Sequence, residues 1–177
     1  MIVTIRQETE ADYSAVFKLT EEAFRTLEIS DHQEQFLVER LRTSNSFIPE
    51  LSMVACTSDG KIVGHILLTK IKIKGEGQSH ESLVLAPISV LPEFQNQGIG
   101  SKLIEAAHKK AKEMGFGSVV LVGHENYYPR FGYELCSKYE INMPIEAPEI
   151  NCMVKELLPG ALRGVSGTVV FDPAFGA

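Results

Sequence analysis

The sequence predicts a mixed α/β fold, and three features indicate it. Residues 2–6 alternate as a short strand, and two helical patterns follow them. An Asp-Gly pair at 59–60 separates two β-like runs, which is typical of an antiparallel hairpin with a two-residue turn. A strand pattern at 82–90 leads into the strongest helical pattern of the chain, at 99–114, and a second buried strand follows at 118–122. Strands and helices therefore alternate within one sheet-based fold.

Two capping signals predict the first helices. Thr9 with Asp12 resembles a capping box and opens an amphipathic pattern. Ser30 with Gln33 gives a second start signal, and the pattern that follows is lost in residues 43–49. We therefore expect two helices in succession after the first strand.

The middle of the chain is predicted to be β-rich. Residues 51–57 and 62–74 flank the Asp-Gly turn, and residues 82–90 are apolar on both faces except for their serines, as in a central strand. Pro92 ends that strand. A loop is predicted before that strand, at Gly75, Gly77 and Ser79.

The helix at 99–114 has one apolar face and one charged face, and Gly115 suits the position after its end. Its lysines, including the run at 109–112, are interpreted as a solvated face. After the strand at 118–122, we expect a short polar helix or turn at 124–130 and a turn into a strand at 131–135.

The tail contains four prolines and two strand-like runs, 152–157 and 167–171. Two strands alone could not bury both of their faces, so no domain boundary is placed before them. We expect a single domain over 1–177, with a core at 1–136 and a C-terminal strand extension at 137–177. The tail strands leave open a homodimer in which they pair across subunits.

Composition narrows the function classes. With 177 residues, 44% of them hydrophobic and 23% charged, the chain can bury an ordinary core. A net charge of −6 argues against a broad nucleic-acid surface. No apolar run is long enough to cross a bilayer and no signal-peptide core is present, so we expect a cytoplasmic protein with no membrane partner. The odd cysteine count without a C-x-x-C pair predicts neither a disulfide framework nor a metal site.

The most informative segment is the glycine-rich turn at 90–101, between a buried strand and the best helix. Such a junction directs unpaired N–H groups and the positive end of the helix dipole at one point, which favours an anion such as phosphate. Two familiar phosphate loops are excluded. A dinucleotide fingerprint would require glycine at Leu103, and a P-loop would require Gly-Lys-Ser/Thr where the chain has Gly100-Ser101-Lys102.

Two motifs carry a family resemblance. Gln95-x-x-Gly98-x-Gly100 resembles the acyl-CoA signature of the GNAT superfamily of N-acetyltransferases, and Tyr128-x-x-x-Gly132-Tyr133 resembles the family's Y-x-x-x-G-[FY] element. The predicted order of strands and helices is similar to the GNAT order over nearly the whole chain. The amino-acid sequences of the two motif segments are most similar to those of the bacterial YhbS-like branch. The resemblance implies a central, mixed but mostly antiparallel sheet flanked by helices.

The resemblance also implies a cosubstrate, acetyl-CoA, and no metal. The backbone of residues 88–90 would pair with the pantetheine arm as an extra strand would, and one amide, at Ser89 or Val90, would face the thioester oxygen. The turn would cradle the pyrophosphate. The implied cofactor-binding residues are Ile88, Ser89, Val90, Gln95, Asn96, Gln97, Gly98, Ile99, Gly100, Ser101 and Tyr128.

Tyr128 is the implied catalytic side chain, because a phenol near the thioester can donate a proton to the leaving thiolate. The alternative is a purely packed ring in an aromatic cluster. Tyr127 is given the structural role, since only Tyr128 has the motif spacing to Gly132. Two interpretations of Arg130 stay open: its side chain contacts a CoA phosphate, or it extends into solvent.

A general base is needed because an amine is mostly protonated at pH 7. The sequence does not assign one, and a water chain is an alternative. His65, His80, Glu81 and His108 are interpreted as structural or loop residues. Candidate bases are Glu21, Glu22, His32, His124 and Glu125, each of which is also explained as a solvated surface residue.

The sequence thus predicts an N-acetyltransferase in which an amine attacks acetyl-CoA directly in a ternary complex. The three cysteines fall outside both motifs, which favours direct transfer. The acceptor is an unidentified small-molecule or protein amine. Two alternatives remain: a non-catalytic acyl-CoA-binding regulatory module, and an anion-binding domain whose glycine turn is only structural.

Overall fold

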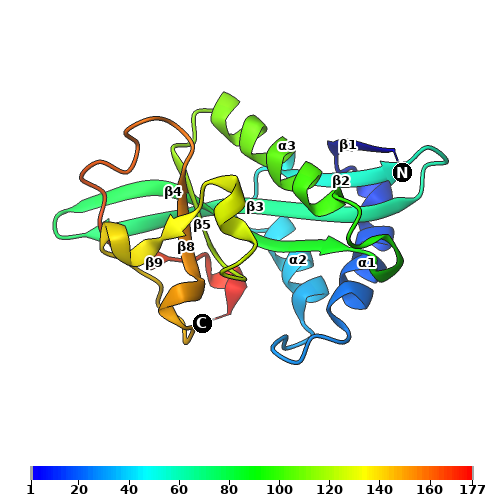
Figure 1. The fold of residues 1–177 in the computed structure, drawn as a ribbon, viewed down its shortest axis with the longest axis horizontal. Helices are drawn as coiled ribbons and strands as arrows, with labels where there is room; N and C mark the ends of the chain where they lie inside the picture. The colour runs from blue at the N-terminus through cyan, green and yellow to red at the C-terminus, as the bar shows by residue number, and fades with distance from the viewer. Residues whose placement is uncertain (1, 177) are drawn as a thin grey trace.

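A computed structural model describes residues 2–176. A single twisted sheet runs through the molecule, with α3 (Ile99–Glu113) on one face and α1 (Tyr13–Phe24) and α2 (Glu34–Arg42) on the other (Figure 1). The sheet order is β1-β2-β3-β4-β5-β8-β6, and β9 pairs with β3 and β7. Its strands are β1 (Val3–Gln7), β2 (Ser52–Thr57), β3 (Ile62–Gly75), β4 (Gln78–Val90), β5 (Ser118–Val122), β6 (Glu134–Leu135), β7 (Ile141–Asn142), β8 (Cys152–Glu156) and β9 (Gly167–Val170).

Alternation along the strands supplies both faces of the core. On β3, a Cβ at Gly64 would contact Leu103 of α3, whereas Leu67 packs with residues of α1 and α2. The α3 side holds the largest apolar cluster, which includes Ile66, Leu83 and Leu103. In the predicted central strand, Leu83 belongs to this cluster and Val84 to the cluster on the other face, so residues 82–85 are buried on both faces, whereas Ile88 and Val90 are partly exposed.

The expected elements are largely present. Asp12 accepts a hydrogen bond from the Thr9 amide at 2.8 Å, and the predicted capping box is present. The hairpin between β2 and β3 forms as expected, but residues 58–61 connect its strands instead of a two-residue turn. The prediction of a loop at 75–79 was wrong. β3 and β4 pair as far as Gly75 with Gln78, so only Glu76 and Gly77 form the turn.

The predicted short helix or turn at 124–130 is present as a 3₁₀ turn, Tyr128–Phe131, which ends at left-handed Gly132. One further expectation differs from the structure. The tail strands do not remain available for a partner subunit. β8 lies between β5 and β6, and β9 lies between β3 and β7, within the same chain.

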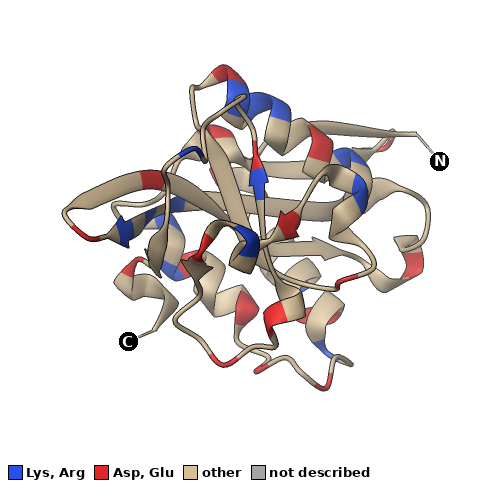
Figure 2. Ribbon diagram, turned by 60° about the vertical axis from the view of Figure 1, so that its left-hand side comes forward, with Lys and Arg blue, Asp and Glu red and all other residues tan. Residues whose placement is uncertain are grey.

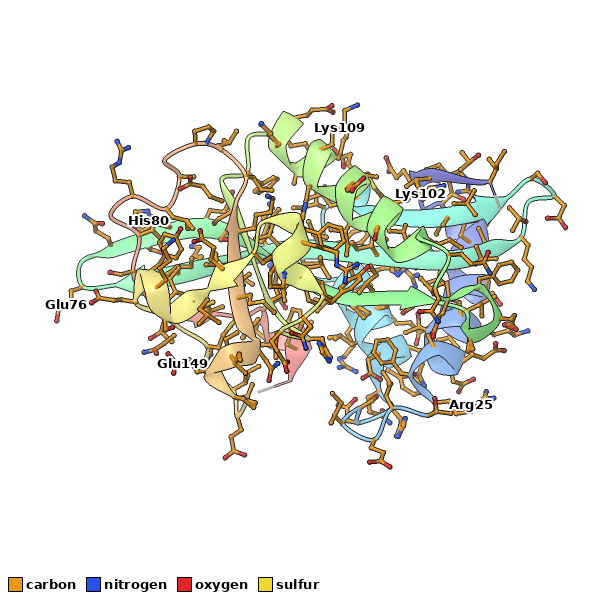
Figure 3. All side chains as sticks on the ribbon, in the orientation of Figure 1. Arg25, Glu76, His80, Lys102, Lys109 and Glu149 are labelled. Carbon is orange, nitrogen blue, oxygen red and sulfur yellow. The ribbon has the colours of Figure 1, made fainter. Side chains whose placement is uncertain are left out.

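Charges of both signs are spread over the surface, with a basic group on α3 (Figure 2). Lys102 and Lys109 point from α3 into solvent (Figure 3), as the sequence predicts for this face. Among the helices of residues 2–176, none is both long enough and apolar enough to cross a bilayer.

Candidate active site

The middle and the C-terminal end of β4 are paired differently. Leu83 and Val84 pair with β3 on one side and with Val119 and Val120 of β5 on the other. Beyond this point β4 carries a bulge, because Ala86 and Pro87 both lie opposite Leu67 of β3. A bulge bends the strand that contains it. The C-terminal end of β4 consequently pairs with β3 alone, and an open edge faces β5.

Hydrogen-bond alternation determines which β4 amides face that edge. The Leu91 amide donates to the Val63 carbonyl on the β3 side at 2.9 Å. In an antiparallel ladder every second residue bonds to the same neighbour, so Ser89 also bonds to β3, opposite His65. The amides of Ile88 and Val90 therefore face the open edge. Of the two amides that the sequence offers for the thioester oxygen, the geometry favours Val90.

The glycine-rich turn forms a concave surface of amides beside this edge. Asn96 and Gly98 both have left-handed backbones, with φ of 63° and 82°. The first backbone bond of α3 runs from the Lys102 amide to the Gly98 carbonyl. The N–H groups of residues 98–101 are therefore left without helical partners and lie at the positive end of the dipole. This arrangement suits a phosphate-bearing ligand.

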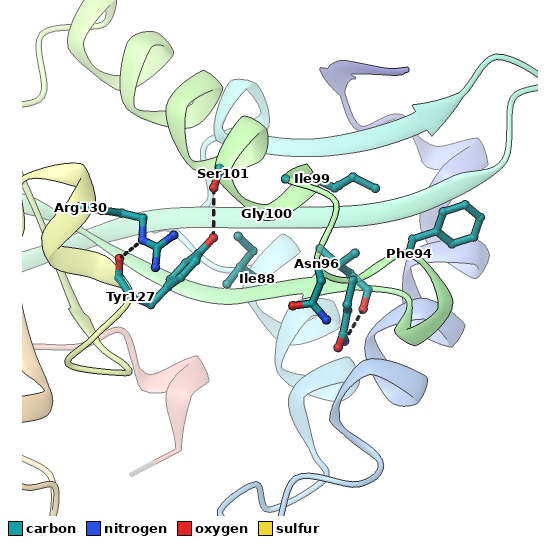
Figure 4. A pocket seen from close by; sticks show the side chains of 11 residues that line it. Ile88, Phe94, Asn96, Ile99, Gly100, Ser101, Tyr127 and Arg130 are labelled. Carbon is teal, nitrogen blue, oxygen red and sulfur yellow. Dashed lines mark hydrogen bonds between the residues drawn. The ribbon is translucent and has the colours of Figure 1, made fainter. Parts of the chain in front are cut away.

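The amide surface and the open edge of β4 belong to one cleft of about 510 Å³ (Figure 4). One wall is the glycine-rich turn with Phe94, and the opposite wall is Tyr127 with Arg130. Gln95 closes the turn, since its Nε2 donates to the Val90 carbonyl at 3.0 Å. The lining residues are Ile88, Val90, Phe94, Gln95, Asn96, Gly98, Ile99, Gly100, Ser101, Tyr127 and Arg130.

The two tyrosines of the doublet have different positions. The Tyr127 hydroxyl lies 3.5 Å from Ser101 Oγ and would be 3.1 Å from a Cβ at Gly100, so it reaches the start of α3. Tyr128 packs edge-on behind it, with ring centroids 5.1 Å apart. Burial raises the pKa of Tyr128 to about 12, which keeps its phenol protonated at neutral pH.

Tyr128 depends on a glycine that the sequence analysis did not single out. A Cβ at Gly123, just after β5, would lie 2.3 Å from the Tyr128 ring, so only glycine leaves room for it. Behind Tyr128 lies Tyr133, whose ring centroid is 5.8 Å away and whose hydroxyl pairs with His108 Nε2 at 2.8 Å.

Most of the predicted cofactor residues line the cleft, but three do not. Ser89 is buried on the opposite face of β4, Gln97 Nε2 lies 3.5 Å from the Glu93 carbonyl, and Tyr128 packs against Tyr127 outside the lining. Sequence reasoning gave Tyr127 a structural role only, although it lines the cleft. Arg130, for which the sequence left open a CoA phosphate contact or solvent exposure, also lines the cleft. Its guanidinium lies 4.7 Å from the centre of the Tyr127 ring.

The candidate bases remain unassigned. Hydrogen bonds from the backbone and from Asn151 Nδ2 hold the pKa of Glu125 below its usual range, which makes it a poor proton acceptor. His124 is exposed and accepts a hydrogen bond from the Asn126 amide at 3.1 Å. Glu21 and His32 lie around a separate hollow between α1 and α2.

Comparison with known proteins identifies the family. The model of the acetyltransferase (GNAT) domain matches residues 4–136. The chain belongs to the GNAT acetyltransferase family. It is 36% identical over 140 residues to the uncharacterized N-acetyltransferase YjhQ of Escherichia coli, covering 77% of each chain. It is 27% identical over 171 residues to the uncharacterized N-acetyltransferase YhbS of the same organism, covering 97% of each. The predicted resemblance to the family is thus confirmed.

Solved structures confirm the GNAT fold. The E. coli YhbS structure in complex with CoA superposes with a TM-score of 0.87 at 25% identity, covering 99% of this chain and 92% of that one. A GNAT acetyltransferase from Brucella melitensis in complex with acetyl-CoA has a TM-score of 0.80 at 29% identity, covering 98% of each chain. Within residues 2–176, no three His, Cys, Asp or Glu side chains are grouped to hold a metal ion.

Proposed function

We propose that this GNAT protein transfers the acetyl group of acetyl-CoA to a primary amine by direct attack in a ternary complex. The observation that carries the proposal is the single cleft that joins the free amides at the start of α3 to the open edge of β4. The first feature suits a pyrophosphate and the second suits an amide-bearing arm. The CoA and acetyl-CoA complexes of its structural neighbours support this assignment.

The cleft residues fit acetyl-CoA in two parts. The amides of residues 98–101 bind the pyrophosphate, and Arg130 at the opposite wall adds a positive charge. The amides and carbonyls along the open edge of β4 pair with the pantetheine arm, as in strand addition. Gly98 suits this surface because its backbone is left-handed and nothing lies within 4 Å of a Cβ built there.

Acetyl-CoA supplies an activated thioester, and the protein orients it. The neutral amine nitrogen forms a bond to the carbonyl carbon, the carbon–sulfur bond breaks, and the electron pair leaves on sulfur. The amide at Val90 donates to the carbonyl oxygen as negative charge develops there. From an ammonium substrate the products are an amide, CoA with its thiol protonated, and one proton released to solvent.

We assign the leaving group to Tyr128 on its spacing to Gly132, although its ring lies outside the cleft lining, so its hydroxyl has to reach the sulfur past Tyr127. The Tyr128 phenol, with a pKa near 12, is a weaker acid than an ordinary thiol, so it stabilises the thiolate mainly by donating a hydrogen bond. Tyr127 contacts the cofactor at the start of α3. All three cysteines are buried and lie outside the cleft lining, in keeping with transfer that has no covalent enzyme intermediate.

The acceptor is a primary amine of a small molecule or a protein. A net charge of −6 favours the approach of a cationic amine over that of an anionic one.

Calorimetric titration with acetyl-CoA and with CoA tests the proposal. Wild-type protein is compared with Gly98→Trp, which places an indole in the amide cradle. The matched control is Gly115→Trp, at the other end of α3, because Gly115 has a similar φ of 89° and equally open surroundings. Circular dichroism checks that both variants fold.

We expect micromolar binding by wild type and by Gly115→Trp, and loss of binding by Gly98→Trp. Wild-type protein is then incubated with spermidine, lysine and a peptide with a free N-terminus, and the thiol released is measured. Failure of folded wild type to bind either ligand would overturn the proposal. Binding without turnover on any amine would favour a non-catalytic CoA-binding module.

A further inference from the structure

A chain of buried polar groups lies under the C-terminal end of β4, on the face that α1 and α2 cover. It begins at Arg42 of α2, whose Nη2 lies 2.6 Å from Glu8 Oε2. Ser52 Oγ donates to Glu8 Oε1 at 2.9 Å and also lies 2.9 Å from His65 Nε2. His65 is fully buried, and Ser89, the register partner of His65 on β4, is 3% exposed. The cleft does not use any of these side chains.

The direction of each hydrogen bond in this chain is fixed. Glu8 is a carboxylate and only accepts. Ser52 has one proton, and it must point at Glu8, because two oxygen lone pairs would otherwise face each other at 2.9 Å. His65 must therefore donate from Nε2 to Ser52. Burial lowers the pKa of His65 to about 4, so its ring is neutral and Nδ1 carries a lone pair.

The far end of the chain has two complementary groups. Within residues 2–176, His65 Nδ1 is a buried acceptor without a hydrogen-bond partner, and Ser89 Oγ is a buried hydroxyl without one. Residues paired across adjacent antiparallel strands project to the same face, with Cβ atoms about 5 Å apart. The two groups are not bonded to each other in the structure, and a bond between them would require the Ser89 hydroxyl to turn toward Nδ1 about χ1.

Ser89 lies between the two residues whose amides face the open edge, Ile88 and Val90. Its own amide bonds to His65 on the β3 side. The backbone amide and the side-chain hydroxyl of Ser89 would thus both bond to His65. Beyond the bulge, β5 no longer supports this part of β4.

We propose that His65 is a positioning residue for acetyl transfer, which holds Ser89 and thereby aims the flanking β4 amides at the thioester. The inference rests on the proposed function. It gives Ser89 a role different from the direct cofactor contact that the sequence predicts. His65 acts through Ser89 and does not touch the reacting atoms.

The test measures the thioester directly and needs no acceptor. [1-¹³C]Acetyl-CoA is bound to the protein, and the infrared carbonyl band reports the strength of hydrogen bonding to its oxygen. Wild type is compared with Ser89→Ala. The matched control is Thr69→Val, which removes another buried, unpartnered hydroxyl on β3, across the bulge from His65.

We expect the bound carbonyl band of wild type and of Thr69→Val to lie below that of free acetyl-CoA. In Ser89→Ala the band should move at least about halfway back, with affinity changed by less than about twofold and turnover on the best amine reduced about tenfold. His65→Phe should give the same band as Ser89→Ala. A merely structural role would change the melting temperature and leave the band in place.

A wild-type band in folded Ser89→Ala would overturn the inference while leaving the proposed function intact. If Ser89→Ala does not fold, Ser89→Cys, which keeps a weak donor of similar size, replaces it. An intermediate band in Ser89→Cys supports the inference, and a wild-type band there counts against it. Lack of acetyl-CoA binding by wild type would instead refute the proposed function.

Discussion

The middle and the C-terminal end of β4 are built from similar residues but serve different purposes. Around Leu83 and Val84 the strand has neighbours on both sides and its hydrogen bonds stabilise the fold. At residues 88–90 it has one neighbour, and the amides of the other edge are free to bind a ligand. Pairing, rather than residue type, therefore separates the supporting part of this strand from its binding part.

Proline substitutions break this comparison most strongly. Val90→Pro removes an amide outside the ladder, so the protein should fold, whereas kcat/KM should fall about 10²–10³-fold through loss of the oxyanion donor. Val84→Pro removes a ladder bond and should prevent folding. Circular dichroism and turnover on the best amine provide the measurements. Full activity in folded Val90→Pro would contradict the assignment of this amide.

Truncations to alanine compare the same two parts of β4 without removing a backbone amide. Leu83 is fully buried, and Leu83→Ala should lower the free energy of unfolding by about 2–5 kcal/mol with little change in the Kd for acetyl-CoA. Ile88 lines the cleft, and Ile88→Ala should cost about 1 kcal/mol or less while raising that Kd several-fold. Urea unfolding and calorimetry measure the two effects. If Leu83→Ala changed mainly the Kd and Ile88→Ala mainly the stability, the division of β4 into a supporting part and a binding part would be wrong.

Acid titration probes the buried pair of His108 and Tyr133, which packs against Tyr128. Burial lowers the pKa of His108, which pairs with Tyr133, to about 4 from an ordinary value of 6.5. The unfolded chain therefore binds more protons between these values, so stability is complete above pH 6.5 and falls as the pH drops to 4. The loss should be about 3 kcal/mol. His108→Gln should remove this component from urea-unfolding curves, and an unchanged pH dependence would contradict it.

The last comparison separates the two tyrosines, and Tyr127→Phe should have the smallest effect of all these variants. Tyr128→Phe should lower kcat about tenfold to a hundredfold by removing the donor to the leaving thiolate, with the Kd for CoA unchanged. Tyr127→Phe should change that Kd only about twofold, since its hydroxyl makes one long contact with Ser101. Steady-state kinetics and calorimetry distinguish them. If Tyr127→Phe alone abolishes turnover, the motif spacing has been assigned to the wrong tyrosine.

The sequence predicts best where local patterns determine structure. The Asp-Gly hairpin, the amphipathic helix and the glycine-rich turn are read from spacing alone, and seven of these turn and helix residues line the cleft or its edge: Gln95, Asn96, Gly98, Ile99, Gly100, Ser101 and Val90. The choice between Ser89 and Val90 required the register with β3. The chain from Glu8 to His65 required the packing of residues from β2, β3 and α2, which no local pattern reports. The bulge at Ala86–Pro87 was likewise not predicted, although it opens the site.

The open edge of β4 also has a consequence for handling the protein. A row of unpaired strand amides is a template on which other chains can add a strand. Acetyl-CoA bound along that edge would occupy it, so the cosubstrate would protect the protein from self-association as well as take part in chemistry. Concentrated samples should scatter more light on storage without CoA than with it, and the open edge would then be the first place to seek the contact that nucleates aggregates.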